Sequence, residues 1–367
     1  MRLKILSFIA AALPLSAHAQ DVRVAVDIAP VHSLVSLVME GVGAPDLIVP
    51  QTASPHDHSM RPSEARALDQ ADVVFWIGPD LTPWLEKSVD TLAADALVVN
   101  VMTDPATKTM PFREGATFEA HDHHDHGAEH KDDHKDEHDD DHDHDDKHAD
   151  GHDEDGHADH ADAHDESHDE AHNDETHNDE THNDEAHHDD DHHDAHGDGQ
   201  DPHVWMDPDN AQNWVAVIAA TLAEADPVNK AVYLQNAANA SSRFAQLDAD
   251  VRARLAPIKG IPFVVSHDAY HYFEAHFDIE AVGAIAASDA QSPSPKRLVE
   301  IRNTIEQTQA KCVFTEPAEN RDWISAVAPD VGVGELDPIG FDVPLGPDHY
   351  FETIRALSVS LAKCLSD

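Results

Sequence analysis

The chain has 367 residues, of which 73 are acidic, 23 are basic and 32 are histidine, and its formal net charge is −50 at pH 7. This charge disfavours nucleic acid and anionic membrane surfaces as partners, because both are negatively charged. It favours a cation as the ligand.

Residues 1–19 have the pattern of a secretory signal peptide. Arg2 and Lys4 precede an apolar run at 5–15, and the sequence AHA at 17–19 is a small-x-small cleavage site. The apolar run is too short to span a bilayer. We therefore expect the mature chain to begin at Gln20 outside the cytoplasm, which means the periplasm in a Gram-negative cell.

Strand-like and helix-like runs alternate in the next part of the chain. This alternation predicts a parallel sheet flanked by helices. The expected strands are 22–30, 46–50, 72–78 and 96–101, and the expected helices are 31–42, 62–71 and 81–93.

An acidic, histidine-rich insertion occupies residues 119–198, with 23 of the 32 histidines, 35 of the 73 acidic residues and three lysines. It has no large apolar side chain, so it cannot bury enough surface to offset the entropy of folding, and we expect it to be disordered. The alternative interpretation is an acidic solubilising spacer, since runs of like charge are usually solvated tails or linkers. Acidity alone, however, does not require a histidine at every fourth or fifth position.

Imidazole and carboxylate together are typical of segments that bind divalent metals. The histidine spacing changes from four to five along the insertion, which indicates many interchangeable weak sites instead of one built site. We expect accessory, low-affinity metal binding by His126, His130, His134, His138, His142, His160, His164 and His168.

A long helical run at 227–256 follows the insertion and the amphipathic helix after it, with Pro227 in its first turn. Some thirty helical residues would extend about 45 Å, which is longer than one small lobe needs. A second alternating set follows it, with strands at 262–267, 279–285, 311–317 and 331–336 and helices at 268–277, 294–308, 320–328 and from 347.

We therefore predict two α/β lobes joined by one long rigid helix. The first lobe is 20–226 and carries the insertion, the connecting helix is 227–256, and the second lobe is 257–367. In such folds ligands bind at the carboxyl ends of strands and between lobes.

Three histidines fall at such places. His56 follows the second strand, His203 begins the chain after the insertion, and His267 ends the strand PFVVSH. Neutral imidazoles suit tetrahedral zinc, and three of them leave one position for a carboxylate or water. Asp337, after the last strand, is the candidate fourth ligand.

Other polar residues near these strand ends have weaker signals. Glu316 ends a strand at the same edge and could orient a ligand. His58 is more simply a loop histidine in solvent, and His276 an ordinary helix residue.

The chain has two cysteines, Cys312 and Cys364. In an oxidising compartment an isolated pair predicts one disulfide, which would tie the last helix to the sheet and stabilise the fold by about 4 kcal/mol. A thiolate metal site would need further ligands nearby.

The motifs SPHDHSMRPSEARALDQADVVFWIG, DPHVWMDP, VVSHDAYHYFE, CVFTEP and LDPIG resemble the zinc-binding proteins of bacterial ABC importers, the ZnuA type, within a cluster that also includes manganese receptors. The resemblance implies two lobes joined by a rigid helix and a Zn²⁺ ion held by His56, His203 and His267, with Asp337 less firmly supported. Manganese-binding relatives tend to have glutamate at the position of His267. The resemblance also implies a paired Cys312 and Cys364, and a His-rich insertion placed as here.

The expected function is capture of Zn²⁺ by a monomeric periplasmic receptor, which delivers the ion to the membrane permease of an ABC importer. The insertion would then collect or sense zinc. Alternatives are a receptor for manganese or another divalent metal, and a passive extracytoplasmic zinc buffer or metal-displaying adhesin. A metal-dependent hydrolase is disfavoured, because no HExxH or GxSxG motif occurs.

Overall fold

The structure is a computed structural model that describes residues 22–113, 115–118, 199–286, 292–317, 321 and 323–366. The chain divides into two units, and every described residue belongs to the unit of residues 1–121 and 194–367. The predicted signal peptide, the insertion 119–198 and its accessory metal-binding histidines lie outside the described residues. The lobe boundaries proposed from the sequence stay a prediction.

The first lobe contains a parallel four-stranded sheet in the order β2-β1-β3-β4. Its strands are β1 (Val24–Val26), β2 (Asp46–Leu47), β3 (Val73–Trp76) and β4 (Leu97–Asn100). Alternate residues of β1 and β3 face opposite sides of the sheet. Helices α2 (Pro62–Asp69) and α3 (Pro83–Leu92) cover one side, and α1 (Ala29–Val38) covers the other.

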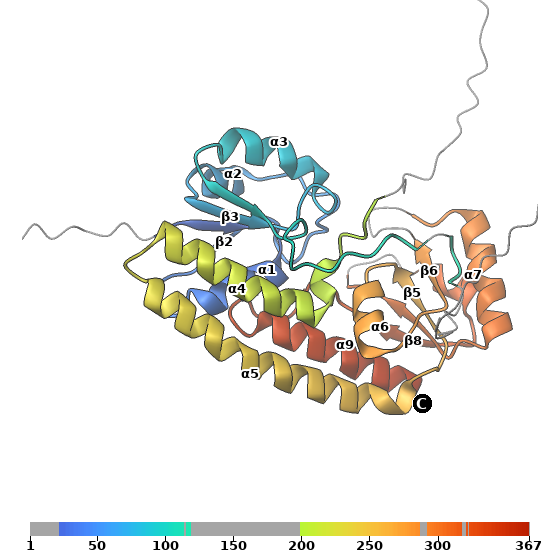
Figure 1. Ribbon diagram of the computed structural model, residues 1–367. Helices are drawn as coiled ribbons and strands as arrows, with labels where there is room; N and C mark the ends of the chain where they lie inside the picture. The colour runs from blue at the N-terminus through green and yellow to red at the C-terminus, as the bar shows by residue number, and fades with distance from the viewer. Residues whose placement is uncertain are drawn as a thin grey trace, which may run out of the picture. The chain divides into compact units, whose positions relative to one another are not determined.

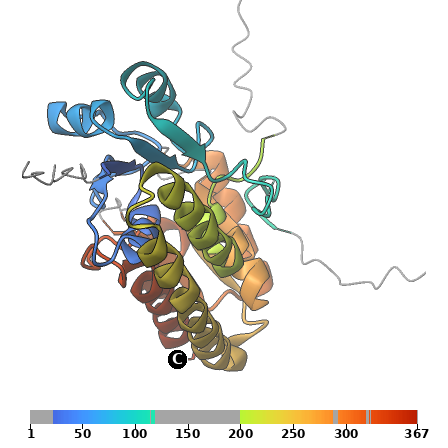
Figure 2. The same ribbon diagram turned by 60° about the vertical axis from the view of Figure 1, so that its left-hand side comes forward.

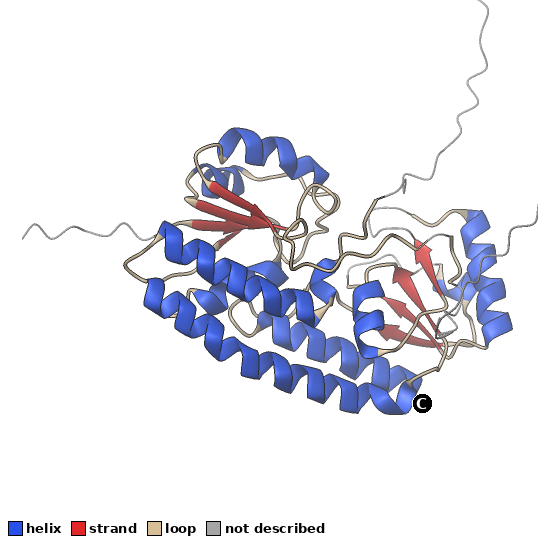
Figure 3. Cartoon of the chain, viewed as in Figure 1, coloured by secondary structure: helices blue, strands red, loops and turns tan. Residues whose placement is uncertain are grey.

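The second lobe repeats this arrangement with the order β6-β5-β7-β8, again all parallel. Its strands are β5 (Phe263–His267), β6 (Gly283–Ala286), β7 (Cys312–Thr315) and β8 (Gly332–Glu335). Helices α7 (Pro295–Thr308) and α8 (Ile324–Val327) cover one side, and α6 (His271–Phe277) and α9 (His349–Leu365) cover the other. Figure 3 shows the two separate sheets. The prediction of two α/β lobes is confirmed.

One apolar core joins the two lobes. It includes Val26 and Phe75 of the first sheet, Val265 and Phe314 of the second, and the buried faces of the helices between them. Helices α4 (Pro208–Ala225), α5 (Lys230–Leu255) and α9 pack side by side (Figures 1 and 2). The shared core means that the lobes are not connected by a flexible linker alone.

Helix α5 has 26 residues, or about 39 Å at 1.5 Å per residue. It begins at Lys230, three residues later than predicted. The Asp226 carboxylate accepts hydrogen bonds from the Asn229 side chain at 2.6 Å and from the Tyr233 hydroxyl at 2.8 Å, which stabilises a turn before the helix. Pro227 therefore lies in this turn and not in the first helical turn.

The predicted disulfide is confirmed. Cys312 of β7 and Cys364 of α9 are bonded, with their Cα atoms 6.2 Å apart. Among the described residues, no helix has both the length and the apolar composition needed to cross a membrane.

Candidate metal centre

The three histidines predicted as ligands lie together. Nε2 of His203 is 3.3 Å from Nε2 of His56 and 3.3 Å from Nε2 of His267. Each of the three offers a nitrogen within 4.8 Å of the others. His203 and His267 are buried, whereas His56 is partly exposed. The site is therefore reachable on the side of His56.

The sequence places each histidine at the edge of a regular element. His267 is the last residue of β5, and His203 directly precedes the short 3-10 helix η1 (Val204–Met206). His56 lies in the loop between β2 and α2. Trp84 of α3 donates from Nε1 to the Pro55 carbonyl at 2.8 Å, which fixes this loop against the first lobe.

His58 also helps to fix the loop, contrary to the expectation that it lies in solvent. Its Nε2 is 2.9 Å from Oε2 of Glu64 on α2, and both side chains are 8% exposed. Glu64 also accepts a hydrogen bond from the backbone N–H of Arg61 at 2.6 Å. The buried Glu64 carboxylate therefore holds His58 in place, a contact that the sequence around His58 does not predict.

Two of the three candidate ligands have a buried carboxylate close to Nδ1, the ring nitrogen on the side away from the other histidines. Nδ1 of His203 is 2.7 Å from Oδ1 of Asp201, and Nδ1 of His267 is 2.6 Å from Oε1 of Glu316. A carboxylate at Nδ1 favours the tautomer with the proton on Nδ1, so Nε2 carries the lone pair. Nε2 lone pairs that face one another at 3.3 Å repel unless a cation lies between them.

The spacing fits zinc. Two nitrogens 3.3 Å apart can each lie about 2.0–2.1 Å from one ion at an N–Zn–N angle of about 107°, which is close to tetrahedral. Three such nitrogens leave one position open for a fourth donor.

The role of Asp201 was not predicted from the sequence. Besides Nδ1 of His203, its Oδ1 accepts the backbone N–H of His203 at 2.9 Å. Burial raises the pKa of Asp201 to about 7, and the neighbouring Asp268 raises it too, whereas the His203 N–H lowers it. The available signal was an aspartate two residues before a candidate ligand histidine, within the motif DPH.

Glu316 lies where the sequence predicted. Its Oε1 also accepts a hydrogen bond from the Tyr270 hydroxyl at 2.9 Å. Tyr270 directly precedes α6, so the carboxylate is held from two elements of the second lobe. This arrangement places a carboxylate 2.6 Å from Nδ1 of His267, where it can orient the ring.

Asp337 does not belong to the group of three histidines, and its carboxylate organises its own loop. The backbone N–H groups of Ile339, Gly340 and Phe341 donate to it at 3.1, 2.8 and 2.5 Å. Burial raises its pKa, while these hydrogen bonds lower it. Its assignment as fourth ligand stays a prediction.

A second group of possible metal ligands comprises Asp207, Asp209 and His276. Nδ1 of His276 is 2.8 Å from Asp207 and Nε2 is 2.9 Å from Asp248, so both nitrogens face carboxylates as in a protonated imidazolium. Lys108 lies 3.1 Å from Asp209. These cations already satisfy the carboxylates, so we interpret the group as an ion-pair network.

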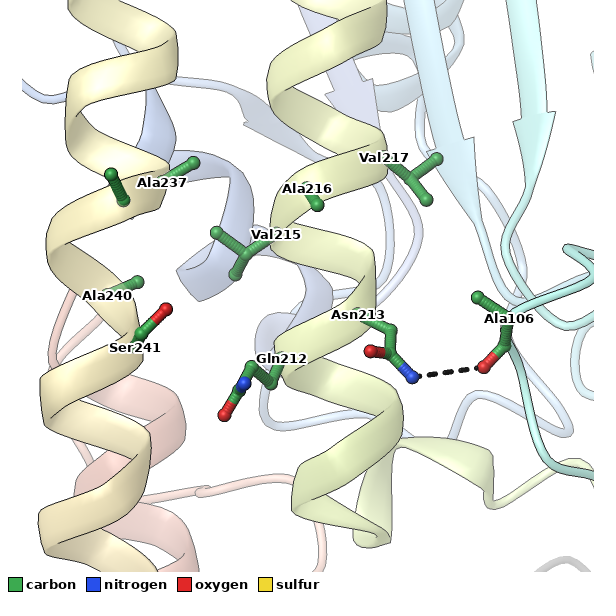
Figure 4. A pocket seen from close by; sticks show the side chains of 10 residues that line it. Ala106, Gln212, Asn213, Val215, Ala216, Val217, Ala237, Ala240 and Ser241 are labelled. Atoms are coloured by element: carbon green, nitrogen blue, oxygen red, sulfur yellow. Dashed lines mark hydrogen bonds between the residues drawn. The ribbon is translucent and has the colours of Figure 1, made fainter.

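A groove between α4 and α5 is lined mainly by alanine and valine, with the polar side chains of Gln212, Asn213 and Ser241 (Figure 4). Asn213 at its edge donates to the Ala106 carbonyl at 3.1 Å. None of the described residues that line it is titratable, so it offers no metal ligands. Its lining residues are Ala106, Gln212, Asn213, Val215, Ala216, Val217, Ala237, Ala238, Ala240 and Ser241.

Comparison with known protein sequences gives matches along nearly the whole chain. The family model described as zinc-uptake complex component A, periplasmic (ZnuA), matches residues 24–364. A Brucella suis protein named high-affinity zinc uptake system protein ZnuA is 39% identical over 345 residues, which cover 94% of this chain and 91% of the relative. The protein of that name from Paracoccus denitrificans is 38% identical over 358 residues, covering 97% and 94%.

Solved structures share the fold. A crystal structure of a ZnuA protein has a TM-score of 0.63 at 17% identity and covers 94% of this chain and 100% of its own. A zinc-bound ZnuA mutant lacking residues 138–173 of its own chain has the same TM-score and identity, covering 95% and 99%.

Proposed function

The chain belongs to the ZnuA family of periplasmic zinc-uptake components, and from this premise we propose that it is an extracytoplasmic zinc receptor. It captures Zn²⁺ and delivers the ion to the membrane permease of an ABC importer. The ion is its cargo, and the proposal includes no catalytic step. The signal-peptide pattern of residues 1–19 supports a periplasmic location.

We assign the zinc ligands to His56, His203 and His267. The observation that carries this assignment is the grouping of the three histidines, with Nε2 of His203 3.3 Å from Nε2 of both His56 and His267, and with Asp201 and Glu316 beside Nδ1 of two of the rings. The fourth donor is water or Asp337. Histidine at position 267 supports zinc over manganese, because imidazole suits zinc better than the harder Mn²⁺ ion.

The insertion 119–198 serves as an accessory zinc collector or sensor in this proposal. Its support is compositional, since 23 histidines alternate there with carboxylates. A passive buffer would need only this insertion, whereas a receptor needs the three flanking histidines. Growth under a zinc chelator separates these functions: loss of a receptor impairs zinc-starved cells, and loss of a buffer does not.

Alanine substitution of each ligand histidine tests the assignment. We expect each of the three variants to lose tight zinc binding in a competition titration with a chelator, while His276→Gln, outside the group, retains it. The sharpest form uses the chain without residues 119–198, because the weak sites are then absent. Unchanged affinity in the triple alanine variant of that chain contradicts the proposal.

A further inference from the structure

We call residues 110–113 and 115–118 the strap. The strap contacts the chain close to both His203 and His267, the two candidate ligands that have a buried carboxylate beside Nδ1. At its first end the Met110 carbonyl accepts the backbone N–H of Asp201 at 2.8 Å, and Pro111 pairs with Gln200 in an antiparallel bridge. The Met110 N–H donates to the Tyr272 hydroxyl at 2.8 Å, and that hydroxyl donates to the Asp201 carbonyl at 2.8 Å. This end of the strap therefore holds the backbone two residues before His203.

The other end of the strap extends the sheet of the second lobe. Thr117 pairs with Gly283 in an antiparallel bridge against β6, the outer strand of that sheet. The Phe118 N–H donates to the Val282 carbonyl at 3.0 Å, and the Ala116 carbonyl accepts the N–H of Ala284 at 3.1 Å. The strap is thus a short added strand that covers an otherwise open sheet edge.

Gly283 makes this close approach possible. A Cβ atom at residue 283 would collide with the Ala116 carbonyl oxygen and would lie 3.1 Å from Cδ1 of Ile301. The absence of a side chain lets the strap backbone lie directly against β6. Arg297 of α7 secures the contact by donating to the carbonyls of Gly115 at 3.1 Å and Ala284 at 2.9 Å.

Between these ends, Arg113 holds the loop after His267. Its Nε lies 3.0 Å from Asp268, the residue that directly follows His267, and its Nη1 lies 2.7 Å from Glu274 of α6. The guanidinium also lies 3.8 Å from the ring centroid of Phe118. The Arg113 side chain is only 8% exposed, so its ion pairs are shielded from water. A charge pair is stronger in such a buried environment than in water.

We propose that Arg113 and the strap are positioning elements for the zinc site, which hold His203 and His267 at their 3.3 Å separation and thereby slow the release of zinc. This inference rests on the proposed three-histidine site and deepens it. Zinc leaves when the strap separates from β6 and the two histidines lose their common support. His56, which belongs to the first lobe, takes no part in this restraint.

The test is Gly283→Ala in the full chain loaded with one equivalent of zinc. The added Cβ displaces the strap without touching a ligand, Asp201 or Glu316. We expect the zinc dissociation rate, followed by transfer to an absorbing chelator, to rise at least about tenfold while the association rate changes little. Hydrogen exchange at the amides of Phe118 and Ala284 should accelerate in the same variant.

Two further variants separate positioning from general damage to the fold. Arg297→Gln removes the contact of a partly exposed side chain of α7 with the strap and should also speed release, with the melting temperature of the metal-free protein unchanged. Adding Ile301→Val to Gly283→Ala relieves crowding at Ile301 but leaves the collision with Ala116. We expect no rescue from it, and restored slow release would overturn the inference.

The outcomes also distinguish this inference from the zinc site itself. If wild-type protein binds zinc through the three histidines and both Gly283→Ala and Arg297→Gln release it at the wild-type rate, the strap has no positioning role. If the alanine variants of the histidines bind zinc as wild type does, the proposed site fails, whatever the strap variants show.

Discussion

Asp201 and Glu316 set the chemistry of the candidate site at the scale of single residues. Each lies within 2.7 Å of Nδ1 of a histidine whose Nε2 faces the other histidines. Without the carboxylate, the imidazole can protonate Nε2 instead and rotate away, and both changes reduce metal affinity.

We therefore predict that Asp201→Asn weakens zinc binding by about 10- to 100-fold, as is typical when a partner of a metal-binding histidine is lost. A chelator competition titration measures the change. Asp209→Asn is the matched control, since Asp209 is exposed and does not contact the three histidines. Equal affinities in wild type and Asp201→Asn would remove the orienting role.

Two roles are open to the Asp337 carboxylate: it can bind zinc as the fourth ligand, or it can only organise its own loop. Asparagine retains a carbonyl oxygen that can accept backbone N–H groups but has no negative charge. If Asp337 only organises the loop, Asp337→Asn should bind zinc within about threefold of wild type, and Asp337→Ala should chiefly lower the melting temperature. A much larger loss of affinity in Asp337→Asn at unchanged stability would identify it as the fourth ligand.

The sequence predicted that the three histidines and Glu316 lie near one another, because each ends a strand or lies in a loop near the edge of a sheet, and the structure brings them together. Their role as zinc ligands stays a prediction. Asp201, Arg113 and the partner of His58 were not identifiable, since their roles depend on side chains brought close only by the tertiary fold. Arg113 contacts residues 155 and 161 positions away in the chain. Its sequence context carries no signal for either contact.

Among elements, all eight strands in the described part of the chain match predicted runs, because each lies in a short, largely apolar segment. The pairing of residues 116–118 with β6 was not predicted, since three residues are too few to show a strand period. The start of α5 was missed for a related reason. Pro227 is compatible with a first helical turn, and only the side-chain contacts of Asp226 decide against it.

His276 links α6 to α4 and α5 through a charge that depends on pH. Burial disfavours its protonated form, but hydrogen bonds to Asp207 and Asp248, with the charges of Asp207 and Asp209, outweigh burial and raise its pKa. Lys108 and Arg252 also form ion pairs with these carboxylates. The pKa of His276 is thus higher in the folded protein than its unfolded value of about 6.5. The ion pairs of His276 therefore contribute their full stabilisation below about pH 6.5.

We predict that the excess unfolding free energy of wild type over His276→Gln is largest below about pH 6.5 and falls as the pH rises through the raised pKa. Denaturant unfolding of both proteins across this range measures it. In Asp248→Asn, which lacks one of the two carboxylate partners, the pH dependence should be smaller. A difference that is independent of pH would show that folding does not raise the pKa of His276.

The Cys312–Cys364 disulfide joins β7 to α9 across 52 positions of sequence. The chain-entropy relation predicts that Cys312→Ala with Cys364→Ala lowers the unfolding free energy by about 4 kcal/mol. Neither sulfur belongs to the three-histidine group, so zinc stoichiometry and affinity should be unchanged in the folded variant. Loss of zinc binding by the folded double variant would contradict this separation of structure from site.

For the whole molecule, we expect deletion of residues 119–198 to leave one tight zinc site and to abolish a larger set of weaker ones. Zinc titration of the two proteins tests this directly. Protons compete with zinc for imidazole, so acidification should empty the weak sites at a higher pH than the three-histidine site. If the full chain and the deletion variant lose their zinc over the same pH range, the proposed order of affinities is wrong.

The pairing of Pro111 with Gln200 and of Thr117 with Gly283 has an evolutionary consequence. Both anchors lie outside the repeats AHNDE and THNDE, so gain or loss of repeat units changes neither the backbone that carries His203 nor the loop that carries His267. Selection can then adjust the number of accessory histidines by simple duplication, while the residues at the root of the insertion stay fixed. We expect the length between Phe118 and Gln200 to vary among close relatives far more than any other part of the chain.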